Sequence, residues 1–330
     1  MNLINRKILV TGAGGFIGSH LIEDLVKLGA NVRAFVHYNS RNDWGNIELL
    51  PDETKRAIEV VSGDIVDSLS VRKAVNGCSI VFHLAALIGI PYSYMAPESY
   101  INTNIIGTLN VLNAALELGV EKLVNTSTSE TYGTALYTPI DEKHPLQGQS
   151  PYSASKIGAD KLAESFFLSF GLPVATIRPF NAYGPRQSAR AVIPSIISQI
   201  LSGEKCIKLG SLEPVRDLSY IKDTTNAFLK ICQSDLSAGE VINVGCGRGI
   251  SISELVNVIK ELTGSNCEVL TDNCRIRPKN SEVMKLVCNY EKARRLIGWE
   301  PEINLRDGLK FTINFIKENI NFYKTEIYNV

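Results

Sequence analysis

The sequence lacks an excess of either charge, with 34 lysines and arginines against 34 aspartates and glutamates in 330 residues. A balanced charge excludes the broad basic surface by which proteins bind nucleic acid or anionic membranes, although a single basic pocket is compatible with it. The sequence also has no apolar run near the roughly 20 residues that a membrane span needs, and no apolar signal region at its start. We therefore expect a cytoplasmic protein that binds neither nucleic acid nor a membrane.

Cysteine patterns are missing as well. The seven cysteines are odd in number, scattered along the chain and nowhere arranged as a CxxC pair. This spacing argues against a disulfide framework and against a zinc site, and it fits buried or idle thiols in a reducing compartment. We predict no metal site.

The sequence does have a globular composition and a regular rhythm. Hydrophobic residues make up 45% and charged residues 21%, and the length suffices for two domains. Predicted strands cover residues 7–10, 32–36, 57–61, 80–84, 122–125 and 174–178, and predicted helices cover residues 19–28, 100–118 and 152–170. Strands separated by helices indicate right-handed βαβ units, so the predicted fold class is α/β, with a Rossmann-type doubly wound parallel sheet.

After residue 178 the rhythm breaks, because prolines interrupt the next stretch. Helical patterns follow at 192–201, 253–263 and 305–322, with a strand pattern at 241–245. These segments predict a smaller mixed α/β C-terminal lobe. We assign residues 1–180, with a return around 217–246, to the sheet domain, and residues 181–216 and 247–330 to the lobe.

Three glycines mark the turn between the first strand and the first helix. Gly12, Gly15 and Gly18 fit a GxxGxxG spacing, in which the first permits a tight turn, the second lets the backbone approach a pyrophosphate and the third permits close packing. The helix start, including Phe16 and Ile17, offers N–H groups and a positive dipole end to phosphates. The context predicts dinucleotide binding; the alternative is a glycine-rich turn without a ligand.

The second predicted strand does not end in the acidic residue that would hold an adenosine ribose. His37, Ser40 and Arg41 follow it instead, either facing a 2′-phosphate or serving as ordinary loop residues, so that NAD and NADP both stay open. Asp64, followed by Ile65, ends the third strand and is placed to meet an adenine edge or to cap a helix.

Tyr152 and Lys156 lie four residues apart in the helical segment 152–170 and therefore share one face. A nearby ammonium favours the phenolate and lowers the pKa of the tyrosine. Such a tyrosine removes a hydroxyl proton while hydride leaves the adjacent carbon. The alternative is a pair on a surface helix.

In sequence order, five motifs match the extended short-chain dehydrogenase/reductase family, which the whole chain resembles. They are TGAGGFIG at 11–18, GDI at 63–65, HLAA at 83–86, YSASK at 152–156 and RPFNAYGP at 178–185. The resemblance implies that the sheet domain binds NAD(P), with Leu84, Ala85 and Ala86 at the cofactor, and that the lobe binds a nucleotide-sugar. It also implies a homodimer built from the helices at 100–118 and 152–170.

Within that family, the residues just before the Tyr132–Gly133 pair separate the reactions. Epimerases generally have no acid there, whereas sugar 4,6-dehydratases have Thr-Asp-Glu or Thr-Ser-Glu. This chain has Thr128, Ser129 and Glu130. The resemblance thus implies that Glu130 removes the carbon-5 proton and returns it to the leaving carbon-6 hydroxyl, with Ser129 or water bridging, while Thr128 contacts the carbon-4 oxygen. The alternative is a solvated loop carboxylate at position 130.

The resemblance also implies a set of substrate contacts: Asn181, Arg186, Arg216, Arg277 and Glu282. Arginine suits such a site because its fork grips phosphate oxygens through two hydrogen bonds. The runs 138–150 and 184–191 resemble the N-acetylglucosamine 4,6-dehydratases of legionaminic acid biosynthesis. That subgroup implies GDP- or UDP-N-acetylglucosamine as substrate and tightly bound NAD.

Two other functions compete with this interpretation. A nucleotide-sugar 4-epimerase would share Tyr152 and Lys156, but Glu130 argues against it. A non-catalytic protein that senses a dinucleotide would need no intact Thr128, Tyr152 and Lys156, and all three are present.

Overall fold

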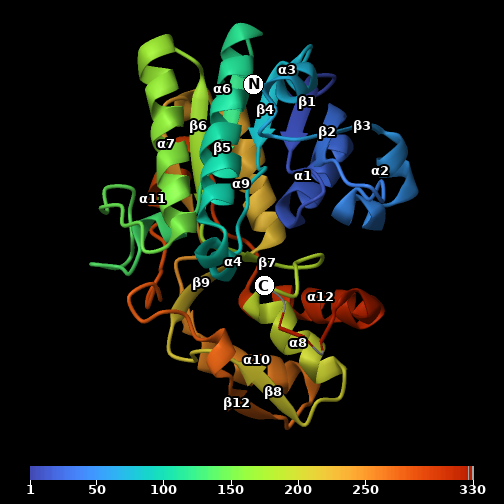
Figure 1. Ribbon diagram of the computed structural model, residues 1–330, viewed down its shortest axis with the longest axis vertical. Helices are drawn as coiled ribbons and strands as arrows, with labels where there is room; N and C mark the ends of the chain where they lie inside the picture. The colour runs from blue at the N-terminus through green and yellow to red at the C-terminus, as the bar shows by residue number, and fades with distance from the viewer. Residues whose placement is uncertain (326, 329–330) are drawn as a thin grey trace.

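The computed structural model describes residues 1–325, 327 and 328, and its centre is a seven-stranded parallel sheet (Figure 1). In spatial order the strands are β10 (Val241–Val244), β6 (Val174–Pro179), β5 (Lys122–Thr126), β4 (Ile80–His83), β1 (Lys7–Thr11), β2 (Asn31–His37) and β3 (Ile58–Gly63). The chain runs outward from β1 to β3 and then returns to the other side of β1 at β4. The crevice at this reversal is where such sheets bind ligands.

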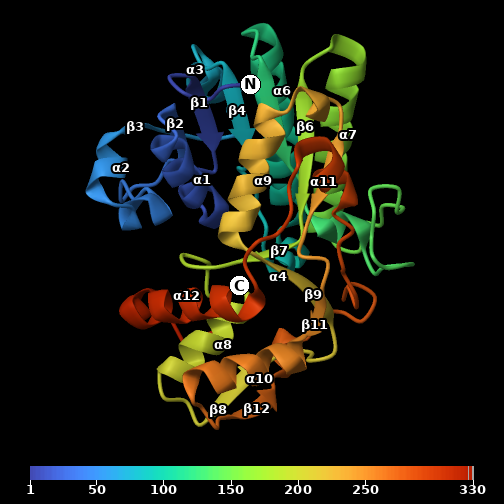
Figure 2. The ribbon, with the colours of Figure 1, turned by 180° about the vertical axis from the view of Figure 1, so that it is seen from behind.

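Helices cover both faces of the sheet, as Figures 1 and 2 show from opposite sides. On one face lie α3 (Ser68–Val75), α6 (Gly107–Glu117) and α7 (Pro151–Phe170), and on the other lie α1 (Phe16–Lys27), α9 (Ile221–Gln233) and α11 (Glu291–Ile297). Since both faces are covered, the central strands β1 and β4 contain continuous apolar runs rather than an alternation of apolar and polar residues. The predicted fold class is confirmed.

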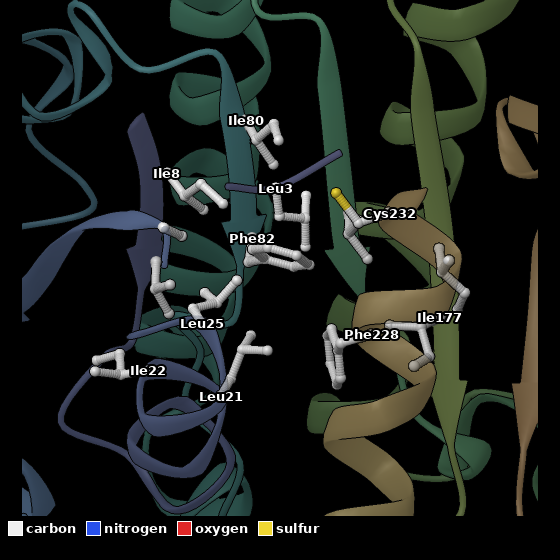
Figure 3. Packing of buried hydrophobic residues seen from close by; sticks show 14 of the residues in the cluster. Leu3, Ile8, Leu21, Ile22, Leu25, Ile80, Phe82, Ile177, Phe228 and Cys232 are labelled. Carbon is white, nitrogen blue, oxygen red and sulfur yellow. The ribbon is translucent and has the colours of Figure 1, made fainter. Parts of the chain in front are cut away.

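The core between the sheet and the helices α1 and α9 is shown in Figure 3. Leu21 and Leu25 of α1 and Phe228 of α9 point at Phe82 of β4, and all four side chains are fully buried. The rings of Phe82 and Phe228 meet edge to face, with their centroids 6.3 Å apart. Burying one such side chain contributes about 1.5–3 kcal/mol. Helix α9 was not predicted, because most residues of its first turn are polar.

The rest of the chain forms a mixed lobe below the sheet in Figure 1. It holds a three-stranded sheet in the order β11 (Gly249–Ser251), β9 (Val215–Tyr220) and β7 (Asn181–Tyr183), and the parallel pair β8 (Cys206–Leu209) and β12 (Glu268–Thr271). Its helices are α8 (Val192–Leu201), α10 (Ile252–Thr263) and α12 (Leu305–Glu318), which share one apolar core. The domain boundaries at residues 180, 217 and 246 stay predictions.

Short elements complete the chain. They are α2 (Asp52–Arg56), α4 (Ile90–Met95), α5 (Pro97–Tyr100), a π-helix (Ile101–Ile106) and the 3₁₀ turns Gly45–Leu49, Ser129–Tyr132, Asp235–Ser237, Asn273–Arg275 and Ile320–Phe322. The helix predicted at 100–118 is therefore α6 preceded by a π-helical stretch. The helix predicted at 305–322 is α-helical only to Glu318. In the part of the chain that the structure describes, no helix combines the length and the apolar character of a membrane span.

Candidate active site

A cavity of about 870 Å³ runs along the carboxyl edge of the large sheet and into the lobe. Its walls come from the glycine turn before α1, the ends of β4 and β5, the start of α7, and the lobe around β7 and β9. It therefore lies at the switch point between β1 and β4. The predicted site residues are placed below in relation to this cavity.

The glycine turn has the geometry that a bound phosphate requires. Gly12 has φ of +67°, and a Cβ there would lie 2.7 Å from the backbone nitrogen of Ala85. A Cβ on Gly18 would lie 2.4 Å from the carbonyl oxygen of Gly12, so neither position accepts a side chain without movement. Gly15 precedes α1 and no side chain caps that helix, whose first residues Phe16 and Ile17 line the cavity. The helix start is thus available to an anion.

The HLAA segment is tied to β1 directly under this turn. The Thr11 hydroxyl accepts hydrogen bonds from the backbone N–H groups of Leu84 and Ala85, each at 3.1 Å. His83 bridges Thr11 at 2.8 Å and Thr108 at 3.0 Å, and burial lowers the pKa of His83 to about 3, so the ring is neutral. Leu84 and Ala86 line the cavity. Ala85 does not line it, because its backbone packs against Gly12.

Of the three residues predicted to contact the adenosine part of the cofactor, only one lines the cavity. His37 lines the cavity, but Asp64 and Ile65 do not. Asp64 is exposed and accepts from the backbone N–H of Val66 at 2.9 Å, while Ile65 is buried in the core against α6. The structure therefore does not bring Asp64 and Ile65 to the site, and Asp67 rather than Asp64 caps α3. Three residues that the sequence did not single out, Asn39, Asp43 and Trp44, line the cavity beside His37.

Tyr152 and Lys156 both reach the cavity from the first turns of α7. The helix start is fixed by a capping box, in which the side chains of Ser150 and Ser153 each accept from the other's backbone N–H. Tyr152 is only 7% exposed, and burial raises its pKa above the ordinary value, opposed by a side-chain hydrogen bond with Thr128. The prediction of a lowered pKa for Tyr152 is wrong for the protein alone, because the effect of burial, which raises this pKa, is the largest one.

The Thr128–Glu130 segment lines the same cavity as Tyr152, and Thr128 forms a side-chain hydrogen bond with Tyr152. Thr128 caps the 3₁₀ turn Ser129–Tyr132, with its hydroxyl accepting from the backbone N–H of Glu130 at 3.2 Å. Glu130 is 8% exposed, so it is not a solvated loop carboxylate. Its charge acts on two neighbours, raising the pKa of Tyr152 and favouring the charged form of Arg216. Glu130 therefore shares one electrostatic environment with both residues.

On the lobe side of the cavity, the Glu282 carboxylate forms ion pairs with two arginines. Glu282 Oε1 accepts from Arg216 Nη2 at 3.2 Å and from Arg277 Nη1 at 3.4 Å. Burial lowers the pKa of Arg216, and Glu130 and Glu282 oppose that effect. Asn181 also lines the cavity, and its side-chain oxygen is buried without a partner among the described residues. Two guanidiniums fit a diphosphate, and the unpaired amide oxygen of Asn181 can accept a hydrogen bond from a donor group of a ligand.

Arg186 was predicted to contact the substrate, and the structure places it elsewhere. It does not line the cavity, and its buried guanidinium forms an ion pair with Glu23 and a 2.5 Å hydrogen bond to His20 Nδ1, both on α1. Burial lowers the pKa of His20 to about 3, which keeps the ring neutral and able to accept this bond. Arg186 therefore fastens the loop after β7 to the helix behind the glycine turn.

The sequence missed other residues of the lobe. Arg275 and Tyr328 line the cavity, with the Arg275 guanidinium carbon 4.9 Å from the centre of the Tyr328 ring. No local sequence pattern predicts them, because they are distant in the sequence and come together only when the lobe folds. Within the described residues, there is no group of three or more His, Cys, Asp or Glu side chains arranged to hold a metal ion.

Comparison with known proteins decides the family. The family described as GDP-mannose 4,6 dehydratase matches residues 9–312. The chain belongs to this family of nucleotide-sugar dehydratases and epimerases. It is 33% identical over 327 residues to the dTDP-D-glucose 4,6-dehydratase of Mus musculus, covering 97% of this chain and 91% of the mouse protein.

Solved structures of this dehydratase and epimerase family have the same fold. The UDP-glucose 4-epimerase of Thermotoga maritima with UDP-glucose has a TM-score of 0.86 and 32% identity, over 95% of this chain and 99% of that one. The dTDP-glucose 4,6-dehydratase DesIV of Streptomyces venezuelae, with NAD and TYD bound, has a TM-score of 0.84 and 27% identity, over 96% and 99%. The relatives include both dehydratases and epimerases, so family membership makes the chain a nucleotide-sugar enzyme without choosing between the two reactions.

Proposed function

We propose that this enzyme is an NAD-dependent 4,6-dehydratase that converts a nucleotide-linked hexose to its 4-keto-6-deoxy form. The observation that carries the proposal is Glu130, a buried carboxylate that lines the same cavity as Tyr152 and acts on its charge. A 4-epimerase moves hydride at one carbon and has no use for a second proton-transfer group. A 4,6-dehydratase needs one, because a carbon-bound proton must be removed after the first oxidation.

The first step is oxidation at carbon 4. Tyr152 takes the hydroxyl proton, Thr128 hydrogen-bonds the same oxygen, and the charge of Lys156 favours the phenolate once the cavity is filled. NAD supplies the redox chemistry when bound, accepting the hydride of carbon 4 and later returning it to carbon 6. The small exposed fraction of Tyr152 limits the access of bulk water to this proton transfer.

The second step is loss of water across carbons 5 and 6. The carbon-4 ketone acidifies the carbon-5 proton, which Glu130 removes. The carbon 6–oxygen bond breaks, and the hydroxyl leaves as water with the proton that Glu130 has just taken, because Ser129 is too weak an acid to supply one. Hydride at carbon 6 and a proton at carbon 5 complete the product, and the proton that Tyr152 took from the carbon-4 hydroxyl balances the one that carbon 5 gains, so the net change is the loss of one water.

The described residues fit NAD at the sheet end of the cavity. The uncapped start of α1 receives the pyrophosphate, and the buried Thr126 hydroxyl, which lines the cavity without a partner in the described chain, is free for the cofactor. NAD rather than NADP is supported by the NAD found in the DesIV structure. Asp43, at the adenosine end, also disfavours a 2′-phosphate by charge.

Gly18→Ala is expected to weaken dinucleotide binding about tenfold or more. The added methyl group would lie 2.4 Å from the Gly12 carbonyl oxygen, so the glycine turn must open. Titration calorimetry with NAD measures the loss, and the circular dichroism of the variant confirms that the fold persists. Unchanged affinity in a folded variant would contradict the placement of the pyrophosphate at this turn.

For the substrate we propose GDP- or UDP-N-acetylglucosamine. Support comes from the resemblance of the runs 138–150 and 184–191 to the dehydratases of legionaminic acid biosynthesis. The arginines held by Glu282 suit the diphosphate that all these substrates share. This proposal places the enzyme early in the synthesis of a deoxy-amino sugar.

The decisive experiment incubates the enzyme with UDP-N-acetylglucosamine, GDP-N-acetylglucosamine, GDP-mannose and dTDP-glucose in separate reactions. Mass spectrometry should find one substrate converted to a product lighter by one water. A changed sugar with unchanged mass would make the enzyme a 4-epimerase, and dinucleotide binding with no turnover would make it a sensor.

We also propose a homodimer formed through α6 and α7. Leu116 on α6, Leu168 on α7 and Ile106 just before α6 are exposed, which leaves apolar surface to cover. Sedimentation as a monomer at micromolar concentration would contradict this. A cytoplasmic location is likewise proposed, in keeping with seven free cysteines, and fractionation of cells tests it.

A further inference from the structure

A buried ion pair lies directly behind the catalytic residues. Asp160 is on α7, one helical turn after Lys156, and Arg178 is on β6. Arg178 donates to Asp160 Oδ2 through Nη2 at 2.9 Å and through Nε at 3.2 Å, and both side chains are buried. Neither residue lines the cavity. The proposed chemistry therefore assigns this pair no task.

Two chains of hydrogen bonds, called arms below, extend from this ion pair. Ser127 donates its hydroxyl proton to Asp160 Oδ2 at 2.6 Å. On the other side, Arg178 Nη1 donates to the Tyr132 hydroxyl at 3.0 Å, and that hydroxyl donates to Asn243 Oδ1 at 2.8 Å. The guanidinium also lies over the Tyr132 ring, with its carbon 5.0 Å from the ring centre. Every link of this chain is buried.

These arms meet the backbone at two particular places. Ser127 immediately precedes Thr128, and Tyr132 ends the 3₁₀ turn that carries Glu130. The ion pair is thus hydrogen-bonded to both ends of the segment 127–132, which carries Thr128 and Glu130. Through Asp160 it also joins that segment to α7, the helix that carries Tyr152. Two groups of catalytic residues from separate elements are connected by one rigid polar network.

General stability does not account for such an arrangement. A buried ion pair often adds no net stability over apolar side chains of similar size, because removing two charges from water costs about as much as their attraction returns. The pair instead fixes the positions of the residues that it joins, because its hydrogen bonds are directional and each donor has one acceptor geometry. A displacement of about 1 Å at a reacting group lowers a rate by about 100-fold.

We propose that Asp160, Arg178 and Tyr132 are positioning residues that set Glu130 and Thr128 against Tyr152. The inference rests on the proposed function, in which Glu130 carries out the elimination and Tyr152 and Thr128 the oxidation. It assigns the two arms different tasks: the Tyr132 hydroxyl holds the Glu130 end of the segment, and the Ser127 hydroxyl holds the Thr128 end.

Tyr132→Phe tests this assignment because it removes one oxygen and keeps the ring, which packs against Phe180 and His144. The elimination is expected to slow by about 10- to 100-fold, while carbon-4 oxidation changes by less than about threefold. In single turnovers, the absorbance of reduced cofactor reports the oxidation. Exchange of the carbon-5 hydrogen with deuterated water, together with 6-deoxy product, reports the elimination.

Two companion variants make the result specific. Ser127→Ala, at the other end of the segment, should slow carbon-4 oxidation, which reverses the order of effects. Ser237→Ala is the matched control: it removes a buried hydroxyl that accepts from Lys122 at 2.7 Å, away from the cavity, and should leave the ratio of the two rates unchanged.

Equal slowing of both steps in Tyr132→Phe, or no slowing of either, would overturn the inference while leaving the proposed function intact. A wild-type enzyme that makes no 6-deoxy product from any of the four nucleotide-sugars would overturn the proposed function, and the inference with it. The two failures are distinguished by the wild-type reaction alone.

Discussion

Glu130→Gln should still oxidise carbon 4 and should make almost no 6-deoxy product. The amide keeps the shape of the buried side chain but neither removes the carbon-5 proton nor delivers one to the leaving hydroxyl. General acid–base groups contribute about 10²–10⁴-fold to a rate, and Glu130 acts twice in one turnover, so we expect a loss at the upper end of that range.

The measurement is a single turnover followed by two signals. Reduced cofactor should appear at close to the wild-type rate and persist, because no later step consumes it, and the mass of the sugar should not fall by one water. Glu164→Gln serves as the control, since Glu164 is an exposed carboxylate on α7 outside the cavity. Normal dehydration by Glu130→Gln would remove the main support for the proposed function.

Tyr152→Phe should stop the reaction one step earlier. Without the phenol no group takes the carbon-4 hydroxyl proton, so neither reduced cofactor nor product should form, with a loss of about 10³-fold or more. The ring is buried against Tyr100, with centroids 6.2 Å apart, so the phenylalanine keeps the packing. The contrast with Glu130→Gln, which retains cofactor reduction, separates the two roles.

The wild-type pH profile adds a second measurement. Burial raises the pKa of Tyr152, so the phenol is protonated at neutral pH and the reactive phenolate is a minor form. The rate of carbon-4 oxidation is therefore expected to rise with pH, and Tyr152→Phe is expected to lack that rise. A residual oxidation rate in Tyr152→Phe with the wild-type pH dependence would assign the base to another group.

The sequence predicted the parts of the site that local patterns encode. The glycine turn and the Tyr152–Lys156 pair are readable because the turn geometry and the spacing along one helix are set within a few residues. The fold class followed in the same way, from the alternation of strand and helix. The switch point between β1 and β4 then placed these motifs at one cavity.

The errors and omissions came from contacts between distant parts of the chain. Arg186 was predicted at the substrate, but its partners His20 and Glu23 are more than 160 residues away in the sequence. Asp64 was placed by its strand end and by the GDI motif, although the next residue is anchored in the core and Asp64 itself is exposed outside the cavity. The pKa of Tyr152 depends on burial, which the four-residue spacing to Lys156 does not report.

The Glu282 carboxylate between Arg216 and Arg277 has a consequence for how tightly a diphosphate is held. Both guanidiniums are ordered before any ligand arrives, so their rotamer entropy is lost during folding rather than during binding. Immobilising a flexible side chain at an interface costs about 0.5–1.5 kcal/mol, and a preorganised pair avoids that cost twice. Removing Glu282 would thus make the free pocket more positive by one charge and still weaken ligand binding, since both arginine side chains would then be immobilised only when the ligand binds.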